Sequence, residues 1–247
     1  MNKKKRIDQI LVDKGLVESR TKAQAIVMAG KIYVDNKKIN KSSEEFEQNI
    51  DIKIKNLNNS WVSRGGLKLY PVIKNNKIKV KDAICIDIGS STGGFSDVLL
   101  KFSVKKIYAV DVGYGQLHER IKSNLKVFSF ERTNARYLND KIIREKVDLI
   151  TCDASFISLK KIINNSLYFL KKNGLVIALI KPQFEANKKE IRKGVVYEHK
   201  IHKRICDDIK LWFEKEKNFK VLKIEESEII GPKGNKEFFI IASKNSW

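Results

Sequence analysis

The sequence predicts an α/β protein in which a doubly wound, mostly parallel seven-stranded sheet follows a small α+β domain. Two observations predict the sheet. From residue 83 onward, short apolar runs alternate with segments of helical periodicity, and the runs are continuously apolar, as is typical of strands covered on both faces. A third observation predicts the small domain, because residues 6–55 have their own helical and strand signals.

The front segment begins with two predicted helices. Ile7, Ile10 and Leu11 recur at helical spacing up to Gly15, and Ser19 is placed to cap a second helix. Strand signals follow in "KIYV" and in the alternating "IDIKIKN", with the turn "DNKK" after the first of them. A helix pair with a hairpin of this size predicts a small α+β domain.

The segment "NLNNSWVSRGG" marks the predicted domain boundary, since it is rich in Asn, Ser and Gly. We therefore expect a first domain over residues 1–58, a linker over residues 59–64 and a larger domain over residues 65–247. With 247 residues, the chain is long enough for both domains.

Strand and helix signals alternate through the larger domain. The pairs are "AICIDIG" with "GGFSDVLLKF", "KKIYAVDVG" with "LHERIKSN", "VDLITCDAS" with "LKKIINNSLYFLKK", and "GLVIALIKP" with "HKRICDDIKLWFEKE". A short strand precedes "RTNAR", and the final strands "FKVLKIEESEI" and "EFFIIAS" follow each other without a helix, which predicts an antiparallel edge hairpin. Pro71 is expected to interrupt the helix around Lys68.

The stretch "DIGSSTGGFSD" predicts a small-molecule site where a buried strand turns into a helix. Its glycines let the backbone approach a ligand closely, near the positive end of the helix dipole. The dinucleotide pattern G-x-G-x-x-G is absent. Asp87 suits the ammonium of S-adenosylmethionine, directly or through water, and Asp111 after the next strand suits its ribose hydroxyls. The alternative that stays open is a glycine-rich turn with a helix-capping acid.

Further candidate contacts follow from the same strand ends. Asn134 and Ala135 come after another short strand and are placed to read an adenine. The expected cofactor-binding residues are Asp87, Gly89, Ser90, Ser91, Thr92, Gly93, Gly94, Phe95, Asp111, Val112, Asn134, Ala135 and Asp153.

Two charged side chains follow the next strands at the same predicted edge. Asp153 ends the strand in "ITCDASF", and Lys181 ends the strand in "ALIKPQFE", so both are expected over one crevice. Taken singly, Asp153 could equally be a helix cap, and Lys181 could equally be a surface charge. Together with Lys68 after "SRGG" and Glu237 at the start of the last strand, they make a Lys, Asp, Lys, Glu set possible.

The composition predicts a polyanionic partner. Fifty Lys and Arg against 29 Asp and Glu give a formal net charge of +21, which suits nucleic acid or an anionic membrane surface. A coding bias toward Lys explains part of this excess. Each lysine of the first domain, taken alone, is more simply interpreted as a solvated surface charge. The candidate RNA contacts are Arg6, Arg20, Lys22, Lys31, Lys37, Lys38 and Arg64.

Three cysteines without a C-x-x-C pair predict neither a disulfide framework nor a zinc site, so no metal is expected. The start "MNKKKRIDQI" lacks the apolar core of a signal peptide, and the longest apolar run, "LVIALI", is too short to span a bilayer. We therefore expect a cytoplasmic protein without membrane insertion. No obligate protein partner is inferred.

These motifs resemble those of the TlyA family, also called hemolysin A, of ribosomal RNA 2′-O-methyltransferases. "WVSRGGLKL", "DIGSSTGGFSD", "CDASFISL", "IKPQFE" and "GNKEFF" occur in the order of that family, and the larger domain is similar to the FtsJ (RrmJ) type. The front segment "RIDQILVDKGLVESRTKAQAIVMAGKIYVDNKKIN" resembles the alpha-L RNA-binding domain, the type found in ribosomal protein S-four.

The resemblance implies a Rossmann-like class I methyltransferase fold and S-adenosyl-L-methionine as the cofactor. It implies methylation of a ribose 2′-hydroxyl, of a cytidine, in ribosomal RNA or ribosomal subunits. It also implies that Lys68, Asp153, Lys181 and Glu237 form the catalytic tetrad. Lys181 is then the candidate proton acceptor, or it orients the hydroxyl, with Asp153 orienting Lys181 in turn.

Three other functions remain as alternatives. The chain could be an RNA-binding assembly factor with an inert methyltransferase fold, or a membrane-active hemolysin. Base methylation is the third, but it usually needs a cysteine nucleophile or an Asn/Asp-Pro-Pro-aromatic motif, where this chain has "DASF". Cys152 is read as a buried strand residue.

Overall fold

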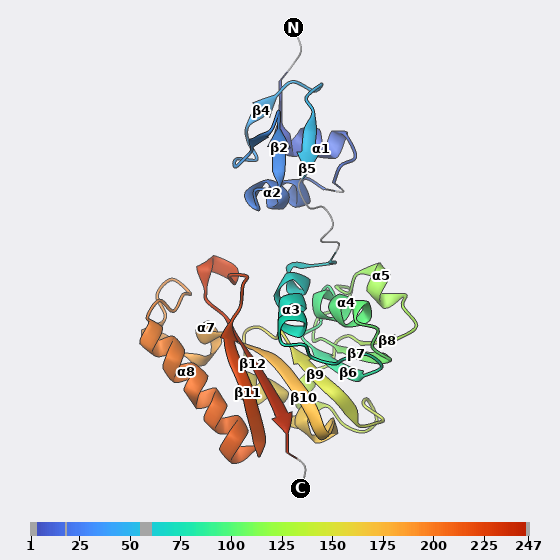
Figure 1. Cartoon of the computed structure of the whole chain (residues 1–247), viewed down its shortest axis with the longest axis vertical. Coiled ribbons are helices and arrows are strands. Elements are labelled where there is room, and N and C mark those ends of the chain that lie inside the picture. The colour runs from blue at the N-terminus through green and yellow to red at the C-terminus, as the bar shows by residue number, and fades with distance from the viewer. Residues whose placement is uncertain (1–3, 18, 55–60, 246–247) are drawn as a thin grey trace. The chain divides into compact units, whose positions relative to one another are not determined.

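The computed structural model describes residues 4–17, 19–54 and 61–245 and divides into two compact units, residues 1–60 and 61–247 (Figure 1). Residue 58, where the first domain is expected to end, and residues 59 and 60 of the expected linker lie outside the described residues. The remaining linker residues lead directly into helix α3, which begins at Arg64. The exact domain limits stay predictions.

The first unit packs two helices against short strands. The helices are α1 (Ile7–Asp13) and α2 (Arg20–Met28), and the strands in its described residues are β1 (Lys5–Arg6), β2 (Ile32–Val34), β3 (Lys37–Lys38), β4 (Glu45–Phe46) and β5 (Ile52–Ile54). Strand β2 pairs antiparallel with both β3 and β5. Ile7, Leu11, Val27 and Ile32 form the centre of its apolar core.

The second unit is built on a seven-stranded sheet in the order β11-β12-β10-β9-β6-β7-β8 (Figure 1). Its strands are β6 (Ile84–Ile88), β7 (Lys106–Val110), β8 (Val127–Phe130), β9 (Val147–Cys152), β10 (Leu170–Ile180), β11 (Phe219–Glu226) and β12 (Phe238–Lys244). The paired strands are parallel except for β12, which is antiparallel to β10 and β11. The predicted mostly parallel sheet with a terminal antiparallel hairpin is confirmed.

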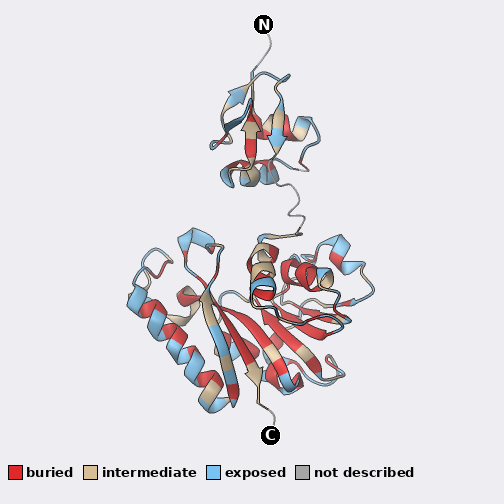
Figure 2. Cartoon of the chain, viewed as in Figure 1, coloured by how far each residue is buried: buried red, intermediate tan, exposed pale blue. Residues whose placement is uncertain are grey.

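Helices cover both faces of this sheet, and its central strands are buried (Figure 2). One face packs against α3 (Arg64–Asn75), α4 (Gly94–Lys101) and α5 (Glu119–Lys122). The other packs against α6 (Leu159–Ile163) and α8 (His199–Leu211). The short helix α7 (Pro182–Glu185) follows β10, and short segments of 3-10 or π-helix cover Ala135–Tyr137, Asn164–Phe169, Lys188–Glu190, Trp212–Glu216 and Pro232–Gly234.

The long helix predicted over residues 159–172 is wrong in its second half. Helix α6 ends at Ile163, a 3-10 segment follows, and β10 already begins at Leu170. Asn and Ser are poor helix formers, so "NNS" weakens the helix at this point without itself ending it. Leu170 instead pairs with Val147 of the neighbouring strand. The helix predicted over residues 117–124 is likewise only one turn long.

Pro71 does not interrupt helix α3, contrary to the prediction. The helix runs through it from Arg64 to Asn75. Proline cannot donate to the carbonyl one turn earlier, but Leu69, Val72 and Ile73 are buried in the core, and their packing holds the helix together. Lys68 therefore sits on a continuous, well-packed helix.

The order of the strands defines where a ligand binds. From β6 the chain proceeds outward through β7 and β8, and it then returns to the other side of β6 with β9 and β10. The reversal lies between β6 and β9, and open α/β sheets bind ligands beyond the carboxyl ends of the strands at such a switch point. The segments after Ile88 and Cys152 are thereby brought together.

Candidate functional site

The glycine loop between β6 and α4 passes close to the segment that follows β9. Gly89 has a φ of 74°, and a Cβ at this position would lie 2.9 Å from the backbone of Ala154. A side chain at this position would collide with that backbone, and the left-handed φ also favours glycine. Bare backbone therefore faces the switch point of the sheet.

Asp87 lies beneath this loop and is fully buried. Ser96 Oγ donates to its Oδ2 at 2.6 Å, and Thr151 Oγ1 donates to its Oδ1 at 2.9 Å. Burial raises the pKa of the Asp87 carboxyl to about 6. Neither Asp87 nor Gly93 lines the cavities that the described residues form at this edge. The carboxylate thus joins β6 to α4 and β9, and its expected contact with a ligand, directly or through water, stays a prediction.

Within the described part of the second unit, two neighbouring cavities open at this edge of the sheet. The first cavity has a volume of about 590 Å³, and the second has a volume of about 450 Å³. Residues that line both are Gly89, Ser91, Asp153, Ser155 and Phe156. The cavities therefore meet along the glycine loop and the segment after β9.

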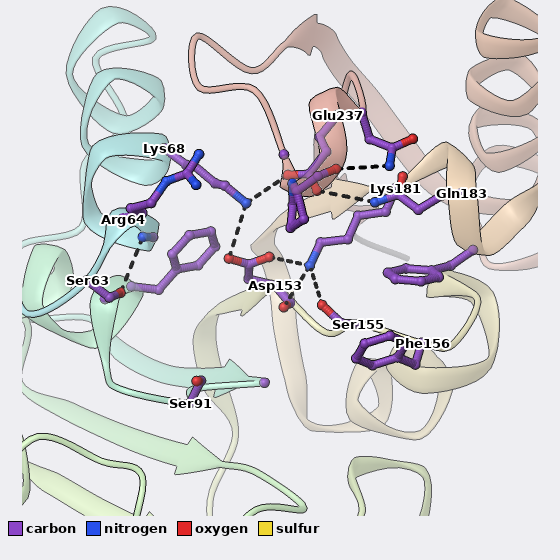
Figure 3. A pocket seen from close by; sticks show the side chains of 18 of the residues that line it. Ser63, Arg64, Lys68, Ser91, Asp153, Ser155, Phe156, Lys181, Gln183 and Glu237 are labelled. Atoms are coloured by element: carbon purple, nitrogen blue, oxygen red, sulfur yellow. Dashed lines mark hydrogen bonds and ion pairs between the residues drawn. The ribbon is translucent and has the colours of Figure 1, made fainter. Parts of the chain in front are cut away.

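The first cavity brings together the four charged residues of the predicted set (Figure 3). Lys68 comes from α3, Asp153 follows β9, Lys181 follows β10, and Glu237 precedes β12. Lys181 Nζ lies 2.6 Å from Asp153 Oδ1, and Lys68 Nζ lies 2.7 Å from Glu237 Oε2. Asp153 Oδ2 lies 3.8 Å from Lys68 Nζ, so this carboxylate stands between the two lysines.

The charges of this cluster balance, because two ammonium groups face two carboxylates. Lys68, Lys181 and Glu237 are buried, so their mutual attraction is stronger than it would be in water. Removing one member of a buried ion pair typically costs about 3–5 kcal/mol. Chemically, the cluster can take up a proton from a hydroxyl and stabilise negative charge that develops on its oxygen.

The structure adds residues to this site that the sequence reasoning missed. Ser155 Oγ lies 2.9 Å from Lys181 Nζ, and Gln183 Nε2 donates to Glu237 Oε1 at 3.5 Å. A Cβ on Gly231 would collide with the Glu237 carboxylate, so glycine leaves the room that this carboxylate occupies. The polar neighbours in "CDASF" and "KPQFE" were a signal for the first two, whereas no local pattern points to Gly231.

The second cavity combines apolar walls with one carboxylate. Asp111 Oδ2 accepts the N–H of Ser91 at 2.8 Å, and its Oδ1 accepts the N–H of Gly113 at 2.7 Å. Each carboxylate oxygen keeps a further lone pair for a ligand hydroxyl. The apolar lining consists of Ile88, Val110, Val112, Ala135, Ile157 and Ile162. These walls suit an adenine and Asp111 suits a ribose, so the residues present fit S-adenosylmethionine.

The expected cofactor contacts divide between the two cavities. Besides the shared residues, the second cavity is lined by Asp111, Val112, Asn134 and Ala135. The Oδ1 of Asn134 accepts the N–H of Arg136 at 3.1 Å. The first cavity is lined by the expected contacts Ser90, Thr92, Gly94 and Phe95, while Asp87 and Gly93 line neither cavity.

In the first unit, Asp8 joins two of the predicted RNA contacts. Arg6 donates to the two oxygens of this buried carboxylate at 3.1 and 3.0 Å, and Arg20 Nε donates to Oδ2 at 3.2 Å. Hydrogen bonds from Arg6 first, and then from Gln24 and Arg20, hold the pKa of Asp8 well below its usual range. The side chains of Arg6 and Arg20 remain 39% and 50% exposed, so both can still meet an anion.

The other predicted RNA contacts are distributed more widely. Lys22, Lys37 and Lys38 are exposed and Lys31 is half-buried. Arg64 belongs to the second unit, where it is the first residue of α3 and lines the first cavity. Its guanidinium donates to the carbonyl of Ile230 at 2.7 Å. The structure thus brings Arg6 and Arg20 together and places Arg64 beside the charged cluster.

Comparisons with known proteins agree with this architecture. The profile of the FtsJ-like methyltransferases matches residues 61–244, and the profile of the S4 domain matches residues 5–49. A candidate rRNA methyltransferase of Bacillus subtilis, YqxC, is 38% identical over 97% of this chain and 85% of its own length. The 16S/23S rRNA (cytidine-2′-O)-methyltransferase TlyA of Mycobacterium tuberculosis is 33% identical over 97% of this chain and 90% of its own.

A solved structure from Streptococcus thermophilus, named as a candidate hemolysin, superposes with a TM-score of 0.77. It is 36% identical in sequence and covers 100% of this chain and 90% of its own. A chain of known structure with this coverage and identity shares both the two-unit organisation of the sequence and the fold.

Proposed function

Because this chain belongs to the TlyA (hemolysin A) family, with an FtsJ-like methyltransferase domain and an S4 domain, we propose that it methylates the ribose 2′-hydroxyl of a cytidine in ribosomal RNA. The observation that carries this proposal is the first cavity. It gathers Lys68, Asp153, Lys181 and Glu237 next to a second cavity that fits an adenosine. We place the activity in the cytoplasm, with ribosomal RNA or ribosomal subunits as the partner.

We assign the cofactor to the second cavity. S-adenosyl-L-methionine supplies a methyl group on a positively charged sulfur, which makes the methyl carbon electrophilic. Asp111 would accept hydrogen bonds from the ribose hydroxyls, and the apolar wall beside Asn134 would hold the adenine. Gly89 keeps the boundary between the cavities free of a side chain. Asp87 would hold β6 against α4 and β9 through its hydroxyl partners.

We assign the activation of the ribose hydroxyl to the charged cluster. A hydroxyl oxygen attacks poorly until it gives up its proton, so a nearby group must take that proton or orient the oxygen lone pair. Lys181 is the candidate for this role, and Asp153 Oδ1 lies 2.6 Å from its Nζ. Lys68, held by Glu237 at 2.7 Å, would stabilise negative charge on the oxygen or bind a flanking phosphate.

RNA recognition would begin in the S4 domain. Arg6 and Arg20 share one buried carboxylate and keep exposed guanidinium edges that suit backbone phosphates. The target nucleotide must leave its stack before its ribose can enter the first cavity. Phe156 is 91% exposed and lines both cavities, so it offers an aromatic face to the unstacked base.

The alternative functions have less support. An inert assembly factor has no need for a buried cluster that pairs two lysines with two carboxylates beside an adenosine-sized cavity. A pore-forming hemolysin finds no support in the helices, since none in the described ranges is long and apolar enough to cross a membrane. Base methylation lacks its usual motif at residues 153–156.

A methyl-transfer assay on ribosomal subunits tests the proposal. Subunits from cells that lack this gene are incubated with the full chain and methyl-tritiated cofactor, and the modified riboses are mapped. We expect Lys181→Ala to lower the rate at least about 100-fold, while calorimetry finds cofactor affinity within about twofold of wild type, because Lys181 lines only the first cavity. Lys210→Ala, an exposed position on α8, is the matched control and should keep full activity.

The two possible failures of this assay differ in meaning. Full turnover by Lys181→Ala would remove Lys181 from the reaction but leave the methyltransferase assignment standing. A wild-type chain that binds subunits and cofactor yet transfers no methyl group would contradict the proposed function itself.

A further inference from the structure

Within the described residues, three oxygen atoms surround Lys181 Nζ (Figure 3). Asp153 Oδ1 lies 2.6 Å away in an ion pair, and Nζ is hydrogen-bonded to the backbone carbonyl of Asp153 at 3.1 Å and to Ser155 Oγ at 2.9 Å. An ammonium has three N–H groups and no lone pair, so a charged Lys181 cannot accept a substrate proton. A neutral amine has two N–H groups and one lone pair, and that lone pair can accept a hydrogen bond from a neighbour that donates.

Ser155 is the partner that can donate. A carboxylate and a backbone carbonyl can only accept, whereas a hydroxyl both donates and accepts. Ser155 is exposed and lines both cavities, whereas Lys181 is only 6% exposed. A ribose hydroxyl can therefore reach Ser155 Oγ while Lys181 keeps its hydrogen bond to the Asp153 carbonyl and its ion pair with the Asp153 carboxylate.

The surrounding groups limit where else a proton could go. Asp153 lies against Lys181, and Lys68 and Glu237 complete the cluster on the other side of that carboxylate. Asp87 and Cys152 are further titratable groups near Asp153. Asp87 is fully buried and bonded to two hydroxyls, and burial raises the pKa of the Cys152 thiol to about 12. The thiol therefore stays protonated at neutral pH and does not compete as a base.

We propose that Ser155 relays the proton of the ribose 2′-hydroxyl to Lys181, an inference that rests on the proposed function. The O–H bond of the ribose breaks, its proton bonds to Ser155 Oγ, and the proton that Ser155 carried moves to the lone pair of Lys181 Nζ. The 2′-oxygen bonds to the methyl carbon, and the carbon–sulfur bond breaks with its electron pair left on sulfur. One positive charge thereby passes from sulfur to Lys181, where Asp153 Oδ1 lies 2.6 Å away.

A proton inventory tests this relay. Single-turnover methyl transfer to ribosomal subunits is measured with the full chain in mixtures of H₂O and D₂O. Because two protons move together, the wild-type rate should fall along a curve as the deuterium fraction rises. Ser155→Ala should be about 10- to 100-fold slower with a linear dependence, and Ser155→Thr should restore both the rate and the curve.

Binding measurements separate this effect from a structural one. Ser155→Ala should bind S-adenosylmethionine in calorimetry, and RNA in filter binding, within about twofold of wild type, because an exposed loop hydroxyl contributes little to the fold. Ser123→Ala, which removes a hydroxyl bonded to the carbonyl of Glu119 on α5, is the matched control and should change neither the rate nor the curve.

Several results would overturn the relay. They are a linear dependence in the wild type, a curve that persists in Ser155→Ala, a wild-type rate in that variant, or a Ser155→Thr variant as slow as Ser155→Ala. In each of these cases methyl transfer by the wild type leaves the proposed function intact. A wild-type chain without methyl transfer would overturn the proposed function, and the relay with it.

Discussion

Buried carboxylates arrange the charged side chains of this protein, and their partners differ. Asp8 accepts hydrogen bonds from two arginines, which hold its pKa well below the usual range. Asp87 accepts from the hydroxyls of Ser96 and Thr151, and burial raises its pKa to about 6. Hydroxyls stabilise a buried charge less than cations do. The strand-end position of Asp87 predicts a role at the site but not its hydroxyl partners, because these come from α4 and β9, which pack beside β6.

Replacing the buried charge of Asp87 should stabilise the fold. The pKa of Asp87 rises from 3.8 to about 6 on folding, and a raised carboxyl pKa means that stability is lost as the pH rises from about 4 to about 6. We expect the Asp87→Asn variant not to lose this stability. Its free energy of unfolding should exceed that of wild type by up to about 3 kcal/mol at pH 7. Urea unfolding at pH 4 and pH 7 measures the difference, which should nearly vanish at pH 4.

The control for this prediction is an exposed aspartate. Asp140→Asn should unfold like wild type at both pH values, because Asp140 is exposed. If Asp87→Asn were no more stable than wild type at pH 7, the buried charge of Asp87 would not destabilise the fold.

At the scale of elements, the sequence predicts helix caps, which are local, but not helix ends that depend on tertiary contacts. Ser19 was expected to cap α2, and its Oγ accepts the N–H of Lys22 at 3.2 Å. The early end of α6 depends instead on the pairing of Leu170 with Val147, which are far apart in sequence. Pro71 shows the same dependence, since the buried side chains of α3 outweigh the missing hydrogen bond.

The cap of α2 should contribute measurably to the first unit. Ser19→Ala removes the acceptor of the Lys22 N–H and should lower the local stability of α2 by about 1 kcal/mol. Hydrogen exchange followed by mass spectrometry should find the amides of α2 exchanging about fivefold faster, with the helices of the second unit unchanged. Ser19→Asp keeps an acceptor and should exchange like wild type; equal exchange in Ser19→Ala would show that the cap contributes nothing.

At the scale of the whole molecule, the two units divide the proposed work between RNA and methyl donor. The first unit holds the arginine pair around Asp8, and the second holds both cavities and the charged cluster. The net charge of +21 predicted a polyanionic partner, but only the S4 domain match and the arrangement of Arg6 and Arg20 direct that prediction to a particular surface. A change of charge in the first unit should therefore change the affinity for RNA but not the affinity for the cofactor.

Neutralising one arginine of the first unit tests this division. Arg20→Gln should weaken binding to an rRNA fragment and reduce the slope of log affinity against log salt concentration by about 1, as expected for one lost phosphate contact. Filter binding over a range of salt measures both, and calorimetry should find unchanged cofactor affinity. Lys210→Gln on α8 removes an equal charge and should leave the slope unchanged; an equal loss there would mean that net charge alone drives binding.

The sequence by itself determined the α/β class, the antiparallel hairpin of the two last strands and the residue types at each strand end, because hydrophobic period and glycine spacing are local properties of the chain. It also marked Lys68, Asp153, Lys181 and Glu237, which the structure brings into one cavity. Only the tertiary structure decided that Lys68 pairs with Glu237 across 169 positions of sequence, that Ser155 contacts Lys181, and that Asp87 is buried between hydroxyls of α4 and β9. Those distances depend on how strands and helices pack side by side, which no local pattern specifies.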